Sequence, residues 1–340
     1  MKTNKVAVPE EELLHVLSAF RKQQIAVLGD VGIDRYTQGI AERISPEAPV
    51  PIVFVQNEYL KLGLAANVAD NIIALGGKVD LTGVAGKDQD GKDLFRMLKS
   101  KKISSAHLVV DPSRRTILKE RIVAETQQML RVDYENTHAL SQQVQKKVQA
   151  SIEKNIRGCQ ALIIEDYAKG LLNRMLIQSS IKAAKKKKIP VLVDPHMKTP
   201  IEWYAGATLL EPNKREAEAL AGERILDQAS LARVGHKIMQ RAQCKSVIIT
   251  LGKDGMAIFR NADCAPALIP TFAQEVYDVS GAGDTVIAVL ALALAAGAKI
   301  EEAAFISNLA AGVEVSKLGT ATVSPQEIMQ AFLSHRGSRF

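Results

Sequence analysis

A short segment near residue 280 carries the residue types that phosphoryl transfer needs. It runs from Asp278 to Asp284 with glycines at 281 and 283 around Ala282, and an apolar stretch follows at 286–296. Glycines permit backbone conformations that point successive amide N–H groups into one small space. The helix predicted from the apolar stretch adds its positive dipole end there. The segment therefore predicts a phosphoryl-transfer site, with Asp284 placed to accept the proton of a hydroxyl.

Acidic and amide side chains follow several of the apolar runs that predict strands. In open α/β sheets, ligands bind beyond the carboxyl ends of the strands, although an acid there also caps the next helix. The residues at these ends are Asp30, Asp34, Glu165, Asp166, Asp194, Glu211 and Asn213. Their recurrence together with the glycine turn favours a ligand site.

Asn213 and Glu216 have the spacing of a capping box, in which each side chain bonds the other residue's backbone. The same pair would lie near nucleotide phosphates and organise water around Mg²⁺, which prefers oxygen ligands and retains water. We expect both roles together, because the helix start faces the ligand crevice.

The elements that position these residues alternate between strand and helix patterns. Strands are predicted at 25–29, 79–84, 161–165, 191–194, 208–211 and 246–250, and helices at 9–22, 65–75, 91–99, 141–155, 173–186, 214–221 and 229–242. This rhythm predicts a mostly parallel sheet covered on both faces. The stretches 35–60 and 113–133 break it with prolines and alternating β patterns, and we expect them to pair as a separate small β layer.

A second glycine-rich stretch, 86–93, nearly matches the phosphate-binding P-loop pattern. Its last position is Asp93 instead of Ser or Thr, so the hydroxyl that binds Mg²⁺ is missing. Asp88 and Asp90 would repel phosphates. We interpret the stretch as a turn leading into a helix near Gly91.

Composition and charge narrow the class of protein. The 340 residues are 47% hydrophobic and 4% aromatic with a net charge of +7, which allows a large core and argues against a stacking surface for nucleic acid. The lysine clusters at 99–102 and 185–188 lie at predicted helix ends, where cations complement the dipole. We therefore expect no nucleic-acid partner, and a positive field that attracts anionic sugar phosphates and nucleotides.

Cysteine usage and hydropathy indicate the compartment. Cys159, Cys244 and Cys264 show no metal-ligand spacing, as expected for a reduced cytoplasmic protein. The polar N-terminus does not resemble a signal peptide, and the longest apolar stretch is too short for a bilayer. A soluble cytoplasmic protein without membrane contact is expected.

The segment 278–284 resembles the signature of the ribokinase-like (PfkB) carbohydrate kinases. The resemblance extends over nearly the whole chain, through 29–34, 63–67, 88–91, 213–216, 250–255 and the late helix around Asn308. It implies an α/β fold, a ribokinase-like three-layer αβα sandwich with a mostly parallel central sheet and a small β-rich lid. Residues 1–340 would form one kinase domain, with the lid made by the excursions near 35–60 and 113–133.

Four segments resemble one subgroup, the bacterial D-glycero-β-D-manno-heptose 7-phosphate kinases: 43–51, 127–133, 166–170 and 317–323. Two-domain members of the subgroup continue into a nucleotidyltransferase region, and this chain resembles a stand-alone kinase. It departs from the family at Leu64, where a second adjacent glycine is usual, and at Lys61, where arginine is more frequent.

The resemblance implies ATP-dependent phosphorylation of the C1 hydroxyl of the heptose 7-phosphate, a step toward ADP-heptose and the lipopolysaccharide core. A kinase for another sugar, sugar phosphate or nucleoside is the alternative, and a non-catalytic binding protein is a remote one. The cofactors implied are ATP and Mg²⁺, with K⁺ as a further candidate. The exposed β patterns also predict a homodimer.

The resemblance assigns roles to individual residues. Asp284 would be the base, and the amides of Gly281, Ala282 and Gly283 would stabilise the transferring phosphoryl group. The nucleotide is expected at Asn213, Glu216, Thr250, Gly252, Gly255 and Asn308, and Mg²⁺ at Asn213 and Glu216 through water. The acceptor is expected at Asp34, Gly63 and Asn67, with Arg43 and Arg131 as candidates for its distant phosphate. Asp278 and residues 315–319 would surround the monovalent cation.

Overall fold

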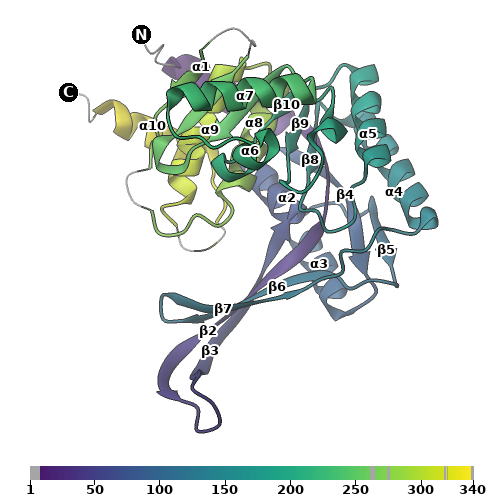
Figure 1. Ribbon diagram of the computed structural model, residues 1–340, viewed down its shortest axis with the longest axis vertical. Coiled ribbons are helices and arrows are strands. Elements are labelled where there is room, and N and C mark those ends of the chain that lie inside the picture. Colours follow the sequence, from purple (N-terminus) through teal and green to yellow (C-terminus); the bar gives the residue numbers. More distant parts are fainter. Residues whose placement is uncertain (1–7, 261–264, 274–275, 318, 320, 338–340) are drawn as a thin grey trace.

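The computed structural model describes residues 8–260, 265–273, 276–317, 319 and 321–337. Figure 1 shows a body of helices and strands from which a long β hairpin projects. Within the described residues the central sheet has nine strands in the order β13-β12-β11-β10-β9-β8-β1-β4-β5. They are β1 (Gln24–Gly29), β4 (Lys78–Gly86), β5 (Leu108–Asp111), β8 (Ala161–Glu165), β9 (Val191–Asp194), β10 (Leu209–Leu210), β11 (Ser246–Thr250), β12 (Met256–Phe259) and β13 (Ala267–Ile269).

The sheet is parallel from β5 to β11 and antiparallel only at the β11–β12–β13 edge. Side chains alternate between its faces, so Ile25 and Val27 of β1 enter one hydrophobic core while Ala26 and Leu28 enter the other. The first core is covered by α1 (Glu10–Ala19), α2 (Ala65–Ala74), α3 (Gln89–Ser100), α8 (Ala282–Ala295), α9 (Ile300–Glu314) and α10 (Pro325–Gly337). The second is covered by α4 (Gln142–Asn155), α5 (Arg174–Lys187), α6 (Lys214–Ala221) and α7 (Gln228–Ala242). The predicted three-layer αβα fold is confirmed.

Helix α8 is apolar on all sides, and every residue from Thr285 to Ala293 is buried. A helix of this kind is stable only when neighbouring elements surround it. Its neighbours include α2, α9 and the strands β8 and β9. The start of α8, which carries Gly281 to Asp284, is therefore held in a fixed position at the edge of the core.

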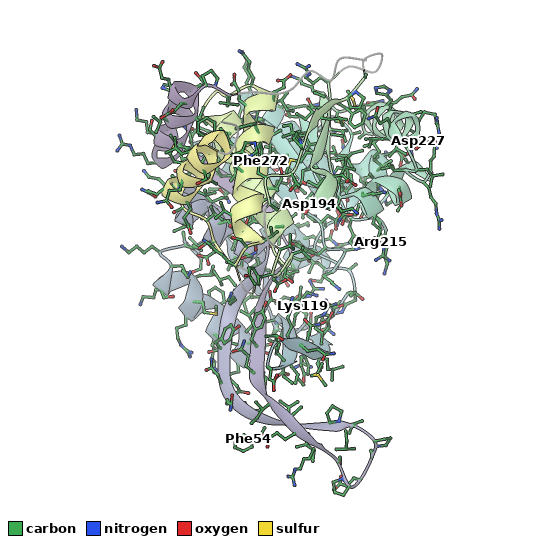
Figure 2. The ribbon with its side chains drawn as sticks, turned by 90° about the vertical axis from the view of Figure 1, so that its left-hand side faces the viewer. Phe54, Lys119, Asp194, Arg215, Asp227 and Phe272 are labelled. Carbon is green, nitrogen blue, oxygen red and sulfur yellow. The ribbon has the colours of Figure 1, made fainter. Side chains whose placement is uncertain are left out.

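The lid is a separate four-stranded sheet in the order β3-β2-β6-β7. It consists of β2 (Val31–Ile44), β3 (Pro51–Leu64), β6 (Ile117–Ala124) and β7 (Gln127–Tyr134). The two excursions do pair with each other, because β2 runs parallel to β6 from Gly32 and Ile117 onward. In Figure 2 the β2–β3 hairpin, with Phe54 labelled, extends well away from the body.

The hairpin covers slightly more of the chain than the excursion expected at 35–60. Its two strands, 31–44 and 51–64, have 14 residues each. Pro46 and Pro49 fall in the turn between the strands, and Pro51 is the first residue of β3. These are positions where a missing backbone N–H removes no ladder hydrogen bond that the strand needs.

Candidate active site

Gly281 forms the turn that leads into α8. Its φ is +97°, in the left-handed region that favours glycine, and its carbonyl oxygen accepts from the Thr285 amide at 3.0 Å. Ala282 to Asp284 form the first helical turn, where backbone N–H groups have no acceptor within the helix. This is the geometry of an anion site at the positive end of a buried helix.

Asp284 is held by two hydrogen bonds, one to each carboxylate oxygen. Asn67 Nδ2 donates to Oδ2 at 2.6 Å, and the Tyr167 hydroxyl donates to Oδ1 at 2.7 Å. Burial raises the pKa of Asp284 to about 6, although both hydrogen bonds lower it. Burial and the nearby carboxylate raise the pKa of Tyr167, so its phenol stays a donor. Asp284 is thus ionised at neutral pH and basic enough to accept a proton.

The residues expected to meet the acceptor lie on the lid side of Asp284. A Cβ built on Gly63 would be 3.2 Å from the Asp34 carboxylate, so the glycine allows a close backbone approach. Asp34 forms an ion pair with Arg121, Nη1 to Oδ1, at 2.8 Å. Burial raises the pKa of Asp34, whereas Arg121 lowers it. The structure therefore brings Asp34, Gly63 and Asn67 to one side of the base.

Leu64 has an unusual backbone conformation for its residue type. It precedes α2 with φ +57° and ψ −141° and is 7% exposed. This combination is adopted almost only by glycine. The residue that departs from the family pattern is thus a buried and strained one beside Gly63.

On the other side of the turn, Asn213 and Glu216 form the predicted capping box. The Glu216 amide donates to Asn213 Oδ1, and the Asn213 amide donates to Glu216 Oε2, both at 3.0 Å. Thr250 pairs with Asn213 through an isolated β bridge. Burial raises the pKa of Glu216. The structural half of the prediction for this pair is confirmed.

Gly255 and Asn308 flank the segment that follows β13, and Gly252 lies in the turn after β11. Gly252 and Gly255 have φ of +61° and +85°, and a Cβ on Gly255 would overlap the carbonyl oxygen of Ile269. Asn308, which is buried in α9, donates to the Pro270 carbonyl oxygen at 2.7 Å. The expected nucleotide residues therefore converge from β11, the β13 end and α9.

Asp278 lies beside the end of α9. The amides of Tyr277 and Asp278 donate to the Val315 carbonyl oxygen at 2.8 and 3.4 Å. The neighbouring Glu314 is fully buried, and burial, together with the charge of Asp278, raises its pKa to about 8. Of the segment 315–319 expected around a monovalent cation, residue 318 lies outside the described residues.

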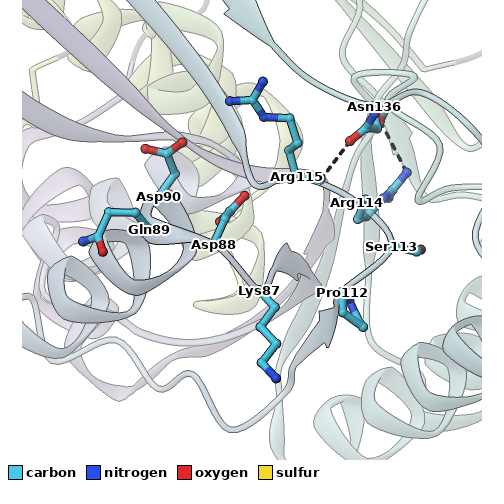
Figure 3. Close-up of a pocket in the computed structure, with 9 residues that line it drawn as sticks. All are labelled: Lys87, Asp88, Gln89, Asp90, Pro112, Ser113, Arg114, Arg115 and Asn136. Carbon is cyan, nitrogen blue, oxygen red and sulfur yellow. Dashed lines mark hydrogen bonds between the residues drawn. The ribbon is translucent and has the colours of Figure 1, made fainter.

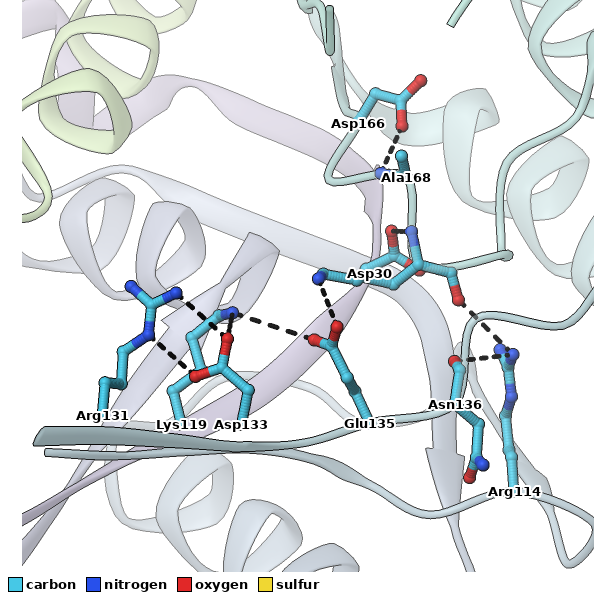
Figure 4. A network of polar contacts seen from close by, with 10 residues as sticks. Asp30, Arg114, Lys119, Arg131, Asp133, Glu135, Asn136, Asp166 and Ala168 are labelled. Atoms are coloured by element: carbon cyan, nitrogen blue, oxygen red, sulfur yellow. Dashed lines mark hydrogen bonds and ion pairs between the residues drawn. The ribbon is translucent and has the colours of Figure 1, made fainter. Parts of the chain in front are cut away.

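The two arginines expected at a distant phosphate are separated. Arg131 forms an ion pair with Asp133, which also pairs with Lys119. Glu135 extends this network to Lys169 of the loop after β8, at 2.6 Å (Figure 4). Arg43 instead lies near the hairpin turn, nine residues along the strand from Asp34, which is roughly 30 Å of extended chain.

A pocket of about 450 Å³ lies at the start of α3 (Figure 3). None of the predicted site residues is among those that line it: Lys87, Asp88, Gln89, Asp90, Pro112, Ser113, Arg114, Arg115 and Asn136. Asp88 caps α3 and accepts from the Gly91 amide and from the amide and hydroxyl of Thr116, each at 2.8 Å. The stretch 86–93 is therefore a capped helix start and not a P-loop, as predicted.

In the described ranges, no three acidic, histidine or cysteine side chains converge closely enough to ligate a metal ion directly. None of the helices in the same ranges is long and apolar enough to cross a membrane.

Comparison with known proteins identifies the family. Residues 22–327 match the model described as pfkB family carbohydrate kinase. The chain belongs to this family. The expected class of enzyme, an ATP-dependent carbohydrate kinase of the PfkB type, is thereby confirmed.

This kinase is 43% identical over 324 residues to a relative named "Bifunctional protein HldE" from Pelobacter propionicus, with 95% of the chain matched. The chain spans about two thirds of the length of the curated relatives it matches, 66% in that case.

Two solved structures share the fold of the kinase. Phosphofructokinase-2 from Escherichia coli in complex with potassium has a TM-score of 0.76 at 20% identity, over 92% of this chain and 99% of that one. Arabidopsis thaliana ribokinase complexed with ribose and ATP has a TM-score of 0.73 at 19% identity, over 91% and 98%. At these identities the similarity shows the fold alone, which is the ribokinase-like fold predicted.

Sequence reasoning gave no role to two residues that the structure places at the site. Tyr167 contacts Asp284 across 117 positions of the chain, and Arg121 reaches Asp34 from the neighbouring lid strand. Tyr167 lies within the segment that carries the subgroup resemblance and directly follows the acids at the end of β8, which was the available signal. The sequence carried no such signal for Arg121, because this residue lies in an ordinary alternating strand pattern.

Proposed function

We propose that this kinase transfers the γ-phosphoryl group of ATP to the C1 hydroxyl of D-glycero-β-D-manno-heptose 7-phosphate. The products are the 1,7-bisphosphate and ADP. The observation that carries the proposal is the position of Asp284. It is a buried carboxylate in the first turn of α8, with Asn67 and Tyr167 fixing its two oxygens.

The reaction follows from the charges at this turn. The C1 oxygen attacks the γ-phosphorus, the bond from that phosphorus to the β-phosphate oxygen breaks, and the hydroxyl proton passes to Asp284. Amides of Gly281, Ala282 and Gly283 donate to the equatorial oxygens of the phosphoryl group as charge develops on them. Asp34 and Asn67 orient the sugar. The ribokinase structure determined with ribose and ATP supports ATP as the donor.

Mg²⁺ would be held through water by Asn213 and Glu216, where it would neutralise the nucleotide phosphates. The residues fit such an ion. Glu216 is a carboxylate whose charge raises the pKa of the nearby buried acids Glu165, Asp194 and Glu211, so a cation there would offset several negative charges. K⁺ would lie near Asp278, where the buried acid Glu314 fits a cation, and the related phosphofructokinase-2 was solved with potassium.

The phosphate at the far end of the acceptor would be met by Arg131 with Lys119 and Lys169, the cations that pair with Asp133 and Glu135. Figure 4 labels Arg131 and Lys119 of this set. A kinase for a different sugar, sugar phosphate or nucleoside is the second candidate. Leu64 favours it, because a buried leucine beside Gly63 changes the wall of the acceptor site relative to the family pattern.

The test is ADP release measured with a panel of acceptors. The heptose 7-phosphate should give the highest kcat/KM. The kcat/KM measured with the dephosphorylated heptose should be at least tenfold lower. A ribose, fructose phosphate or nucleoside that outperforms it would establish the second candidate instead.

We also propose that the kinase is a cytoplasmic homodimer that pairs through its lid. The lid carries exposed apolar side chains, including Ile44, Phe54 and Leu130, which are 63%, 70% and 54% exposed. Exposed apolar strands of this kind commonly pair with a second chain. ATP and a sugar phosphate, the proposed substrates, are metabolites of the cytoplasm.

A further inference from the structure

The loop after β8 contacts both the proposed base and the lid. Tyr167, near its start, donates to Asp284 Oδ1 at 2.7 Å. Lys169, two residues later, pairs with Glu135, the residue that follows lid strand β7, at 2.6 Å. One short segment thus holds the base with one side chain and joins the cation network proposed for the distant phosphate with another.

Two buried acids fix the backbone of this loop, and Figure 4 labels both. Asp166 Oδ1 accepts from the Ala168 amide at 2.8 Å. Asp30 accepts from the amides of Lys169 and Leu171 at 3.1 and 3.4 Å. Because hydrogen bonds to an ionised acceptor are stronger than those between neutral groups, the two carboxylates hold the path of the chain from 168 to 171.

Both acids are anchored to the body in turn. Asp166 Oδ2 accepts from the hydroxyls of Thr199 and Tyr204, at 2.8 and 2.7 Å, in the segment between β9 and β10. Tyr204 is fully buried. Asp30 directly follows β1, which pairs with β8 inside the central sheet. The loop is therefore fastened to the sheet through two neighbouring strands.

The backbone of the loop has little room to change. Ala168 and Gly170 have φ of +53° and +92°, and a left-handed residue other than glycine persists only where its surroundings hold it. A Cβ built on Gly170 would lie 2.5 Å from the His138 carbonyl oxygen. Arg114 donates to the carbonyl oxygens of both His138 and Lys169. The fold thus sets the backbone positions of Tyr167 and Lys169 relative to each other.

The other cations of the network belong to the lid. Arg131 lies on β7 and pairs with Asp133, two residues along the same strand, at 2.8 Å. Lys119 lies on β6 and pairs with Asp133 and Glu135. Of these three cations, Lys169 is therefore the one that shares a loop with the residue bonded to the base.

We propose that Lys169 is a specificity-determining residue that fixes the length of the acceptor, from its phosphate to the hydroxyl that reacts. An ammonium group has three donors, so Lys169 can bind a phosphate oxygen while it keeps Glu135. The loop holds this ammonium group at a set separation from the Tyr167–Asp284 pair. A phosphate bound there brings only a hydroxyl at the matching distance to the base.

The consequence is an effect on kcat. Binding energy from a remote group is used to align the reacting atoms, so loss of Lys169 should lower kcat in addition to raising KM. A cation that only attracts the phosphate contributes mainly to KM. The inference rests on the proposed function for the place of the phosphate.

Steady-state kinetics with the best acceptor of the panel test this role. Lys169→Met should lower kcat at least about tenfold. Arg131→Met is the matched control, because it removes a cation of the same network from the lid, and it should mainly raise KM for the acceptor. Lys169→Arg keeps the charge but changes the reach, so it should restore KM more than kcat. ATP affinity measured by calorimetry shows that each variant is folded.

A shortened acceptor gives a second readout. The hexose 6-phosphate with the same ring has one carbon fewer before the phosphate, so its kcat with the wild type should be lower by at least about tenfold. Lys169→Met should reduce this ratio to about threefold or less, whereas Arg131→Met should keep it.

A wild type that does not distinguish the two lengths, an unchanged ratio in Lys169→Met, or a loss confined to KM in that variant would overturn the inference. A different winner in the acceptor panel would contradict the heptose assignment instead. The kcat of Lys169→Met with that winner would still test the loop.

Discussion

Asp284 is a buried carboxylate, and replacing it with asparagine removes the group that accepts the proton while keeping its shape. Asp284→Asn keeps the shape and can still bond Tyr167, but it cannot accept the proton. We expect kcat to fall by roughly 10²- to 10⁴-fold, the usual range for loss of a general base, while nucleotide affinity measured by calorimetry stays within a few fold. Unreduced kcat in this variant would rule out Asp284 as the base.

The same substitution should stabilise the fold at neutral pH. The pKa of Asp284 is raised from 3.8 to about 6 in the folded chain, so the folded state binds the proton more tightly than the unfolded state. Stability from this group is therefore lost as pH rises from about 4 to 6. Asp284→Asn should raise Tm at pH 7.5 and give little gain at pH 4, as measured by scanning calorimetry at both pH values.

Tyr167 controls the basicity of Asp284. Its hydrogen bond lowers the pKa of the carboxyl group, so Tyr167→Phe should raise that pKa. In the wild type we expect kcat/KM to decline below about pH 6, and in the variant the decline should begin at higher pH. Profiles that superimpose would mean that the acid limb reports another group.

At the scale of elements, the turn from β3 into α2 carries strain that glycine would relieve. Leu64 has positive φ with a ψ that L residues rarely adopt, at a cost of order 1–3 kcal/mol. Both Leu64→Ala and Leu64→Gly remove the buried side chain, but only glycine adopts this conformation without strain. We expect Leu64→Gly to be the more stable of the two by about 1 kcal/mol in urea unfolding, despite its larger chain entropy when unfolded.

Measuring KM for the sugar in both variants shows whether the Leu64 side chain also shapes the acceptor site, in addition to its effect on backbone strain. If its side chain shapes the acceptor site, both variants should change KM for the sugar and leave KM for ATP unchanged. Equal stability of the two variants would contradict the strain argument, whatever their kinetics.

The elements of the body were predictable because their signals are local. Strands such as β1 and β8 are continuous apolar runs, and α6 begins with a capping box visible as Asn213 and Glu216. The turn at the start of α8 was equally visible in the sequence, because Gly281 and Gly283 precede the long apolar stretch of the helix. These features depend on residues a few positions apart.

Other features depend on contacts across the chain and were not predictable. The length of β2 and β3 follows from their pairing with each other along the whole hairpin, which local prolines concealed. The position of Arg43, close in sequence to Asp34 but far along an extended strand, follows from that length. The contacts of Tyr167 and Arg121 likewise arise only when separate elements meet.

At the scale of the whole molecule, the lid is the surface expected to join two copies. Phe54→Ser removes an apolar side chain that is 70% exposed on the hairpin, and we expect it to shift the mass measured by light scattering toward the monomer at micromolar concentration. Leu226→Ser is the matched control, since Leu226 is 82% exposed but follows α6 on the body. A monomeric wild type would contradict the proposed dimer. A dimer that Phe54→Ser leaves intact would show that the interface lies elsewhere.

The two ends of the lid hairpin are joined at one point of the body. The Ala65 amide donates to the Asp30 carbonyl oxygen at 3.0 Å, and the Asp30 carboxylate is itself bound by the loop after β8. From this point β2 extends 14 residues, roughly 45 Å at the rise of a strand, and Asp34 lies in its first third. Asp34 is four residues from this anchor, roughly 13 Å along the strand. A rigid tilt of the hairpin about the anchor would therefore move Asp34 by less than a third of the displacement of the tip, and would leave the base on α8 in place.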